Sequence, residues 1–328
     1  MTTITTIVPT YRRPADLARC LTALRHQLRS PDEVLVVVRD TDNETRQFLE
    51  LFDHAPLPLR VITVTVTGVV AAMNMGLDAA QGDIIAFTDD DAAPHPDWLT
   101  RIEQHFLADD RVGGVGGRDL MYCNGAIVEG AKQTVGQLQW FGRVIGNHHL
   151  GTGTAREVDV LKGVNMSFRR TAIANSRFDT RMRGTGAQVH FEIEFSLSLK
   201  RAGWTLIYDP HILVDHYPAQ RFDEDQRHTF NEVAFANAVH NETLALLEHL
   251  APEKRLLFVL WATFVGTRKA FGFVQLLRFT PHEKHLAWKK WQASVQGRWQ
   301  GWQTWQHSQR NPRSFNQSFM QVNQTAKL

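Results

Sequence analysis

Cysteine is scarce in this chain, because only Cys20 and Cys123 occur among 328 residues and they lie far apart in the sequence. Two thiols cannot form a disulfide framework, and they cannot by themselves form a four-ligand zinc site. The scarcity favours a protein that works in a reducing compartment, so we expect a cytoplasmic location.

Long apolar runs are also missing. The longest is Leu256–Gly266, and Arg268 and Lys269 follow it at once. A membrane-spanning helix needs roughly 20 apolar residues, so this run predicts no span. Residues 1–9 form a β-type segment without the basic start of a secretory leader, and we expect none.

Several nucleotide-binding and hydrolytic motifs are absent. The chain has no Gly-x-x-x-x-Gly-Lys-Ser/Thr, which excludes a P-loop, and no serine nucleophile elbow or His-Glu-x-x-His. The glycine-rich run at residues 113–117 lies far from the first strand and lacks the spacing of a dinucleotide fingerprint. We expect no nucleic-acid partner.

Charge is distributed unevenly, although the formal net charge is only +2. Residues 251–328 contain 12 Lys and Arg against 2 Asp and Glu, whereas residues 1–250 contain 24 against 32. The same 78 C-terminal residues hold six of the nine tryptophans. An acidic body followed by a basic, tryptophan-rich extension predicts two parts with different roles.

Strands and helices are predicted to alternate over the first 90 residues. The expected strands are residues 3–9, 33–38, 60–65 and 83–88, and the expected helices begin near residues 14, 44 and 69. This alternation predicts an α/β fold, with a mostly parallel sheet covered by helices and a site at the carboxyl ends of the strands. Further on, we expect a helix at 189–202, strands at 205–208 and 212–214, and one long helix at 223–250.

Asp89, Asp90 and Asp91 directly follow the fourth expected strand. Three adjacent carboxylates repel one another and are stable together mainly with a cation. Side chains alternate along an extended segment, so Asp89 and Asp91 can face the same way and bind Mg²⁺ or Mn²⁺. A solvated acidic turn is the alternative, but the position after a strand of an α/β pattern favours a metal site.

Glu192 and Glu194 lie on the helix expected at 189–202. Residues two apart on a helix point about 200° apart, so only one of the two can face a given pocket. Glu192 lies beside the apolar stripe and is the better candidate for a general base. These residues leave an alternative open, in which both glutamates are ordinary helix carboxylates that form ion pairs with Lys200 or Arg201. His216 follows an expected strand as Asp89 does, although a lone histidine is more often structural than a metal ligand.

Taken together, these segments resemble glycosyltransferase family 2, the inverting enzymes of the GT-A fold. The resemblance covers residues 1 to about 220. The segments that match in order are Ile7–Tyr11, Gly68 with Asn74 and Gly76–Leu77, Gly82–Asp91, Gly163–Arg169, Phe178–Asp179, Glu192–Leu197, Arg201–Trp204 and Asp215–His216.

The resemblance implies a role for each matching position. It implies that Glu192 is the catalytic base, with Glu194 as a substitute, and that Asp89, Asp91 and His216 bind the divalent metal. The residues implied to bind the nucleotide-sugar are Pro9, Thr10, Tyr11, Arg13, Asp40, Gly68, Asn74, Asp89, Asp90, Gly163 and Asn165.

The chain departs from the family pattern at three places. The second strand ends in Arg39-Asp40, so the contact with the base could shift to Asp40 or Asp42. The catalytic base is Glu192 after Phe191, where the family has Asp after Glu. The Gln-x-x-Arg-Trp motif of processive synthases is missing, so we expect single additions rather than polymer extrusion.

The expected function is a metal-dependent inverting glycosyltransferase. It would move one sugar from a nucleotide-diphosphate sugar to a hydroxyl of a glycan, glycolipid or lipid-linked acceptor, as in making a cell-envelope polysaccharide. The alternatives are a non-catalytic scaffold that binds sugar-nucleotides or carbohydrate and, less favoured, a nucleotidyltransferase. The expected organisation is a transferase domain at 1–220, a long helix at 221–250 and a helical C-terminal extension at 251–328.

The C-terminal extension carries an arc of aromatic residues. Trp288, Trp291, Trp299 and Trp302, together with Val295, fall within about 80° of one helix face at 100° per residue. A basic helix with a tryptophan face is typical of interfacial binding to an anionic membrane, which predicts a peripheral location on its inner face. The alternative is a helix that packs on the body of the enzyme or on a second subunit.

Overall fold

The computed structural model describes residues 2–227 and 229–310 of the chain. Its centre is a ten-stranded sheet in the order β10-β12-β6-β11-β4-β1-β2-β3, with β5 paired to β12 and β7 to β6. The strands are β1 (Ile4–Thr10), β2 (Glu33–Arg39), β3 (Leu59–Val64), β4 (Ile84–Phe87), β5 (Ala92–Pro94), β6 (Val112–Cys123), β7 (Ala126–Ile127), β10 (Arg156–Glu157), β11 (Met166–Arg169) and β12 (Thr205–His216).

The pairing of strands β1 to β4 is parallel, with β1 between β2 and β4 and β3 at the edge. Strands β6 and β12 are also parallel, whereas β11 runs antiparallel to both β4 and β6. The predicted α/β fold with a mostly parallel sheet is therefore confirmed.

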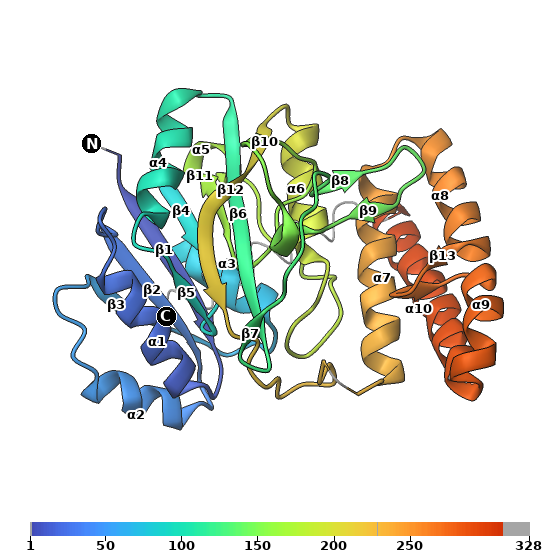
Figure 1. The fold of residues 1–328 in the computed structure, drawn as a ribbon, viewed down its shortest axis with the longest axis horizontal. Coiled ribbons are helices and arrows are strands. Elements are labelled where there is room, and N and C mark those ends of the chain that lie inside the picture. Colours follow the sequence, from blue (N-terminus) through green and yellow to red (C-terminus); the bar gives the residue numbers. More distant parts are fainter. Residues whose placement is uncertain (1, 228, 311–328) are drawn as a thin grey trace.

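Strand β2 shows why this sheet is buried on both faces. Its run Val34–Val38 is fully buried, and alternate side chains enter two different apolar clusters. Leu35 and Val37 face the cluster that contains α3 (Val69–Ala79) and α6 (Phe191–Arg201). Val34 and Val36 face the cluster that contains α1 (Pro14–Arg25) and α4 (Trp98–Ala108). Helices thus cover both faces (Figure 1).

The other helices of residues 1–220 are short. They are α2 (Asn43–Leu51), α5 (Arg170–Ile173) and the 3₁₀ turn η1 (His148–Leu150). A separate hairpin, β8 (Gln137–Leu138) with β9 (Val144–Ile145), extends towards the C-terminal helices (Figure 1).

Two expectations about local structure were wrong. The strands expected at 205–208 and 212–214 are one strand, β12, with an irregularity between Asp209 and Leu213 where Pro210 cannot donate to the ladder. The helix expected at 223–250 begins only at Glu232, because the Asn231 side chain accepts from the first free amides and caps it there. Residues 221–227 form a loop.

Up to residue 310, where the description ends, four helices form the C-terminal part, which lies at one end of the molecule (Figure 1). They are α7 (Glu232–His249), α8 (Pro252–Phe264), α9 (Phe273–Glu283) and α10 (His285–Arg310), with the small hairpin of β13 (Gly266–Thr267) and β14 (Ala270–Phe271) between α8 and α9. The predicted helical C-terminal extension is confirmed. Within the described ranges, none of the helices combines the length and apolarity that crossing a bilayer requires.

Helix α10 packs along α7 through a stripe of small residues, Ala293, Ser294, Gly297 and Gly301. The contact is close, since a Cβ atom added at Gly297 would lie 2.4 Å from the carbonyl oxygen of Ala236 on α7. The tryptophan arc lies on other sides of α10. Trp288 and Trp299 are exposed, whereas Trp291 and Trp302 are half-buried against neighbouring apolar clusters.

Candidate functional site

A cavity of about 410 Å³ opens at the carboxyl ends of β1, β2 and β4. This is where a parallel α/β sheet places ligands, because loops rather than helices cover that edge. Most of the residues predicted to bind donor or metal line it. They are Pro9, Thr10, Tyr11, Arg13, Gly68, Asp89, Asp90, Asp91, Gly163, Glu192 and His216.

Asp89, Asp91 and His216 meet in this cavity with one ligand atom each, all within 4.8 Å of one another. The two aspartates follow β4, and His216 ends β12. Strand β5 pairs antiparallel with β12 in the register that sets Ala92 opposite His216, which brings the histidine beside Asp91. The Nε2 atom of His216 lies 3.4 Å from Oδ1 of Asp91.

Burial and the neighbouring charges shift the pKa values of the groups in this cluster. Burial and the charge of Asp91 raise the pKa of Asp89 to about 7. Burial, opposed by Arg13, raises the pKa of Asp90 to about 6. Burial also disfavours the charge on His216, but Asp119 and Asp91 outweigh it and raise the pKa of His216 to about 9. Metal binding at such a cluster displaces protons.

The donor set fits a divalent cation. Carboxylate oxygens and imidazole nitrogen are ligands that Mg²⁺ and Mn²⁺ accept. Among the described residues, Oδ1 of Asp91 and the Nε2 atom of His216 that faces it are buried without a hydrogen-bond partner. Buried polar atoms normally have partners, so these orphaned atoms indicate a ligand between them.

Cationic side chains surround the carboxylates. The Nη1 atom of Arg13 lies 2.8 Å from Asp90, and Nη2 of Arg227 lies 3.5 Å from Asp91. The cavity is also lined by Arg39, Lys162 and Arg221. Guanidinium and ammonium groups that converge beside a cation site are well placed to bind phosphate oxygens.

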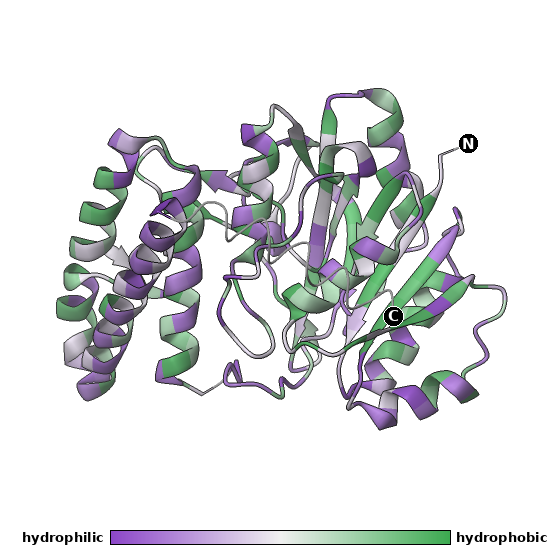
Figure 2. Cartoon of the chain, turned by 180° about the vertical axis from the view of Figure 1, so that it is seen from behind, coloured by the Kyte–Doolittle hydropathy of each residue, from purple (hydrophilic) through white to green (hydrophobic). Residues whose placement is uncertain are grey.

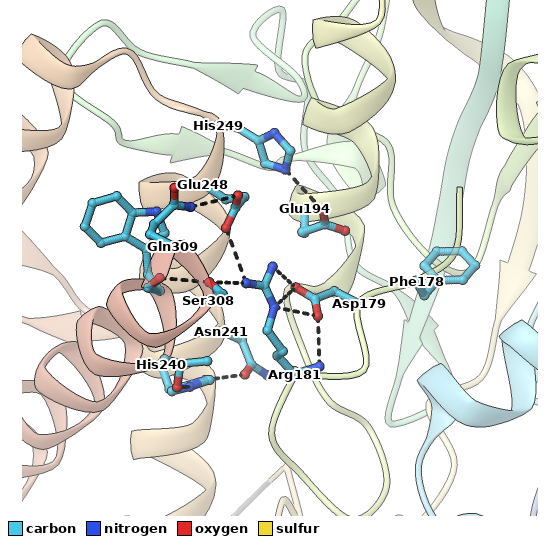
Figure 3. A network of polar contacts seen from close by, with 12 residues as sticks. Phe178, Asp179, Arg181, Glu194, His240, Asn241, Glu248, His249, Ser308 and Gln309 are labelled. Carbon is cyan, nitrogen blue, oxygen red and sulfur yellow. Dashed lines mark hydrogen bonds and ion pairs between the residues drawn. The ribbon is translucent and has the colours of Figure 1, made fainter. Parts of the chain in front are cut away.

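Glu192 begins the first turn of α6 and lines the cavity. Gly163 lies directly against it, since a Cβ atom added at Gly163 would be 3.3 Å from Oε1 of Glu192. Glu194 points elsewhere, and its Oε1 lies 3.2 Å from Nε2 of His249 on α7 (Figure 3). Burial raises the pKa of Glu194. The structure thus brings only one of the two glutamates to the cavity.

Three predicted binding residues lie outside the cavity lining. Asp40 is exposed and accepts a hydrogen bond from Arg39, and the cavity is lined instead by Arg39, at the end of β2, and by Thr41, which follows the strand. The Asn74 side chain exchanges two hydrogen bonds with the backbone of Phe178. Asn165 is buried and bonds to Trp98 and Ile212. The two asparagines hold the fold around the site.

Asp119 on β6 was missed by sequence reasoning, as was Lys162. The Oδ2 atom of Asp119 lies 2.6 Å from Nζ of Lys162 and 3.6 Å from Nδ1 of His216. Asp119 is almost fully buried, and Lys162 and His216 hold its pKa below the usual range against the effect of burial. No local pattern marks Asp119, because the pairing of β6 with β12 brings it to His216.

A network of polar contacts ties the loop beside the cavity to the C-terminal helices (Figure 3). Arg181 binds the Asp179 carboxylate with Nη2 at 2.7 Å, and its Nη1 contacts Glu248 on α7 and Ser308 on α10. Asn241 on α7 bonds to the backbone on both sides of residues 184–188, several of which line the cavity.

Comparison with known proteins agrees with this geometry. The model of the family described as "Glycosyl transferase family 2" matches residues 5–173. Glycosyltransferase AglE of Haloferax volcanii is 26% identical over 225 residues, which cover 67% of this chain and 68% of that protein. Succinoglycan biosynthesis protein ExoM of Rhizobium meliloti is 35% identical over 98 residues, 29% of this chain and 32% of that protein.

Solved structures share the fold at low sequence identity. S. aureus TarS 1–349 in complex with UDP-GlcNAc superimposes with a TM-score of 0.57 at 17% identity, covering 88% of this chain and 78% of TarS. GalNAc-T7 with UDP, GalNAc and Mn²⁺ superimposes with a TM-score of 0.62 at 13% identity, covering 80% of this chain and 50% of that one. With its GT-A-type sheet and the match over more than half of its length, this chain is a glycosyltransferase that belongs to glycosyl transferase family 2.

Proposed function

We propose that this enzyme transfers a single sugar, with inversion, from a nucleotide-diphosphate sugar to a hydroxyl group of its acceptor, and that it requires Mg²⁺ or Mn²⁺. One observation carries the proposal. Three residues that could hold a cation, Asp89, Asp91 and His216, line the same cavity as the carboxylate of Glu192, which forms no ion pair within the described part of the chain.

The donor would lie along the carboxyl ends of β1 to β4. Pro9 and Tyr11, with Val66 beyond β3, form the less polar side of the cavity, where a nucleoside fits. Arg13 lies beside Asp90 and Arg227 lies beside Asp91, and these two arginines would bind the diphosphate. A divalent cation held by the triad would supply neutralisation of the charge that develops on the leaving diphosphate.

Glu192 would act on the acceptor. It would accept the proton of the attacking hydroxyl as that oxygen displaces the nucleotide diphosphate in line. Gly163 leaves room beside this carboxylate for the incoming hydroxyl group, since a Cβ atom there would lie 3.3 Å from both the Glu192 oxygen and the Phe191 ring. One displacement inverts the anomeric centre, and no enzyme nucleophile is required.

The acceptor is proposed to be a glycan, glycolipid or lipid-linked saccharide of the cell envelope, met at the inner face of a membrane. The name of the relative ExoM, a succinoglycan biosynthesis protein, supports a polysaccharide product. The basic C-terminal extension, with 12 Lys and Arg against 2 Asp and Glu, supports a position at an anionic surface.

Donor turnover tests the catalytic part of the proposal. The full chain is incubated with a panel of nucleotide sugars that begins with UDP-GlcNAc and UDP-GalNAc, with Mn²⁺, with Mg²⁺ or with EDTA. We expect release of the nucleotide diphosphate with one donor, loss of that activity in EDTA, and an inverted product by NMR. Turnover that persists in EDTA, or a product with retained configuration, would contradict the proposal.

A further inference from the structure

Exposed apolar side chains are concentrated on two consecutive helices of the C-terminal part. Of the 22 large hydrophobic residues that are exposed in the described chain, nine lie between residues 256 and 277. A monomeric protein in water rarely exposes contiguous apolar patches larger than a few hundred Å², so such a concentration marks an interaction surface. We call the exposed side of α8 and α9 the outer face.

The outer face is apolar on both helices. On α8, Leu256, Leu257, Leu260 and Phe264 fall within about 100° of one another at 100° per residue, and they are 39% to 63% exposed. Phe258, on the opposite side of α8, is 1% exposed. The helix is therefore held to the protein by one side and is apolar on the other as well.

Helix α9 continues the same pattern. Phe273, Val274 and Leu277 also fall within about 100°, and they are 47% to 59% exposed, whereas Leu276 is buried. The hairpin of β13 and β14 joins the two helices, which form the outer edge of the molecule in Figure 1. Green segments recur along this edge in Figure 2.

Positive charge accompanies the outer face. Lys254, Arg268, Lys269, Arg278 and Lys284 are exposed, and none of them forms an ion pair with another described residue. Between residues 252 and 284 only two carboxylates occur, and that of Glu283 is paired with Lys290. An apolar face with a basic rim complements a bilayer surface that carries anionic lipids.

From this geometry we infer that the outer face of α8 and α9 lies on an anionic lipid bilayer and is its primary membrane contact. The inference rests on the proposed location at a membrane and names the surface responsible. It differs from the sequence-based expectation, which assigned binding to the tryptophans of α10. Trp291 and Trp302 of that arc are half-buried against the protein.

Vesicle co-sedimentation of the full chain tests the inference. The probes are phosphatidylcholine vesicles with and without 30% phosphatidylglycerol, at low and high salt. The test variant, Leu256→Ser with Leu260→Ser and Phe264→Ser, keeps every charge. A matched control, Leu28→Ser with Leu51→Ser and Leu107→Ser, removes three side chains that are 66% to 88% exposed elsewhere.

We expect wild type and control to bind the anionic vesicles and the test variant to bind at least about 10-fold less, since each buried methylene contributes about 0.8 kcal/mol. Replacing Lys254, Lys269 and Arg278 by Gln should weaken binding and its salt dependence. Unchanged binding by the test variant, or loss only in a Trp288→Ser/Trp299→Ser variant, would overturn the inference.

The same set of proteins distinguishes a bilayer from two other candidate occupants of the outer face. If a second copy covers it, analytical ultracentrifugation without lipid shows a dimer that the test variant dissociates. If the chain after residue 310 covers it, vesicle binding of wild type rises when that segment is removed. Either result overturns the inference. Turnover of a water-soluble donor should be the same in wild type and test variant, so failure of membrane binding and failure of the proposed catalysis are distinguished.

Discussion

The Nδ1 atom of His216 lies 3.6 Å from Oδ2 of Asp119, on the ring edge opposite the one that faces Asp91. A carboxylate at the far nitrogen of a metal-binding histidine fixes the orientation of the ring and makes it a better ligand. Lys162, 2.6 Å from the same oxygen, compensates the buried charge of Asp119. His216 is thus held between two carboxylates, one on either side.

The first prediction is that Asp119→Asn weakens Mn²⁺ binding by about 10- to 100-fold, the range typical of residues that orient metal ligands. The affinity is measured by the electron paramagnetic resonance signal of free Mn²⁺. Asp209→Asn is the matched control. Asp209 lies on the same strand as His216 and contacts His105 and His211, but it does not line the cavity. Equal affinity in a folded Asp119→Asn protein would show that Asp119 does not position His216.

The second prediction concerns the triad itself. Asp91→Ala should abolish transfer and metal-dependent nucleotide binding, because it removes one group of the triad. The protein should stay folded, because the change also removes one of the three adjacent carboxylates that repel one another. Nucleotide binding with and without Mn²⁺ is measured by calorimetry. Asp215→Ala is the control, since Asp215 is next to His216 in sequence but pairs with His95. Wild-type transfer by Asp91→Ala without added metal would refute the metal assignment.

The third prediction separates the two glutamates of α6. Glu192→Gln should lower kcat by about 10²-fold or more with donor binding nearly intact, because a positioned base contributes typically 10²–10⁴-fold. Glu194→Gln should affect kcat much less and act on stability, because Glu194 is paired with His249 between α6 and α7. Single-turnover rates and urea unfolding of both variants check this. A larger loss of kcat at Glu194 would reverse the assignment.

The fourth prediction is a pH dependence of stability. His240 is buried between α7 and α10, and burial lowers its pKa to about 4. In the unfolded chain His240 binds a proton near pH 6.5, whereas in the folded chain it does so only near pH 4. The unfolding free energy is therefore undiminished by His240 above pH 6.5, and it decreases as the pH falls from 6.5 to 4. The shift corresponds to about 3 kcal/mol.

Urea unfolding at pH 7.5 and at pH 5 measures this dependence. His240→Gln should flatten the decline of the unfolding free energy between these pH values. His282→Gln, at an exposed histidine of α9, should leave it unchanged. The same slope in His240→Gln as in wild type would exclude this histidine as a source of the acid sensitivity.

The fifth prediction concerns the contact of α10 with α7. Gly297→Val should destabilise the protein by at least about 1–3 kcal/mol, because its side chain would meet the backbone of Ala236 and His240 and the Cβ atom of Val239. Gln303→Val, at an exposed position of the same helix, is the control. Chemical denaturation measures both variants. A neutral Gly297→Val would mean that α10 can leave α7 without affecting the rest of the fold.

The sequence was informative where function depends on residues close together along the chain. The buried run of β2 and the three aspartates after β4 are continuous segments, so hydrophobicity and strand order were enough to predict them. Helical periodicity predicted that Glu192 and Glu194 point to different sides of α6, as the structure has them, whereas the choice of Glu192 as base also relied on the family resemblance.

The sequence was uninformative where strand register or a loop decides the outcome. Asp119 reaches His216 only because β6 pairs with β12, and Lys162 then pairs with Asp119 from the segment before β11. Arg227 reaches Asp91 because the segment before α7 is a loop, held by Asp223 and Glu224 to residues 185 and 187. The charged residues of this segment have adequate helix propensity, but their hydrogen bonds to the backbone of residues 185 and 187 outweigh that propensity.

The hydrogen bonds of Asn241 limit how the loop beside the cavity, residues 184–188, can be redesigned. One amide side chain fixes the backbone of Arg183 and of Val189, so the segment between them has a set span. Insertions or deletions there would have to be absorbed inside that span, whereas point substitutions at Thr185 or Ala187 leave the anchors in place. Variant libraries of this loop should therefore change side chains at constant length, and a graft of the loop should include the helix that carries Asn241.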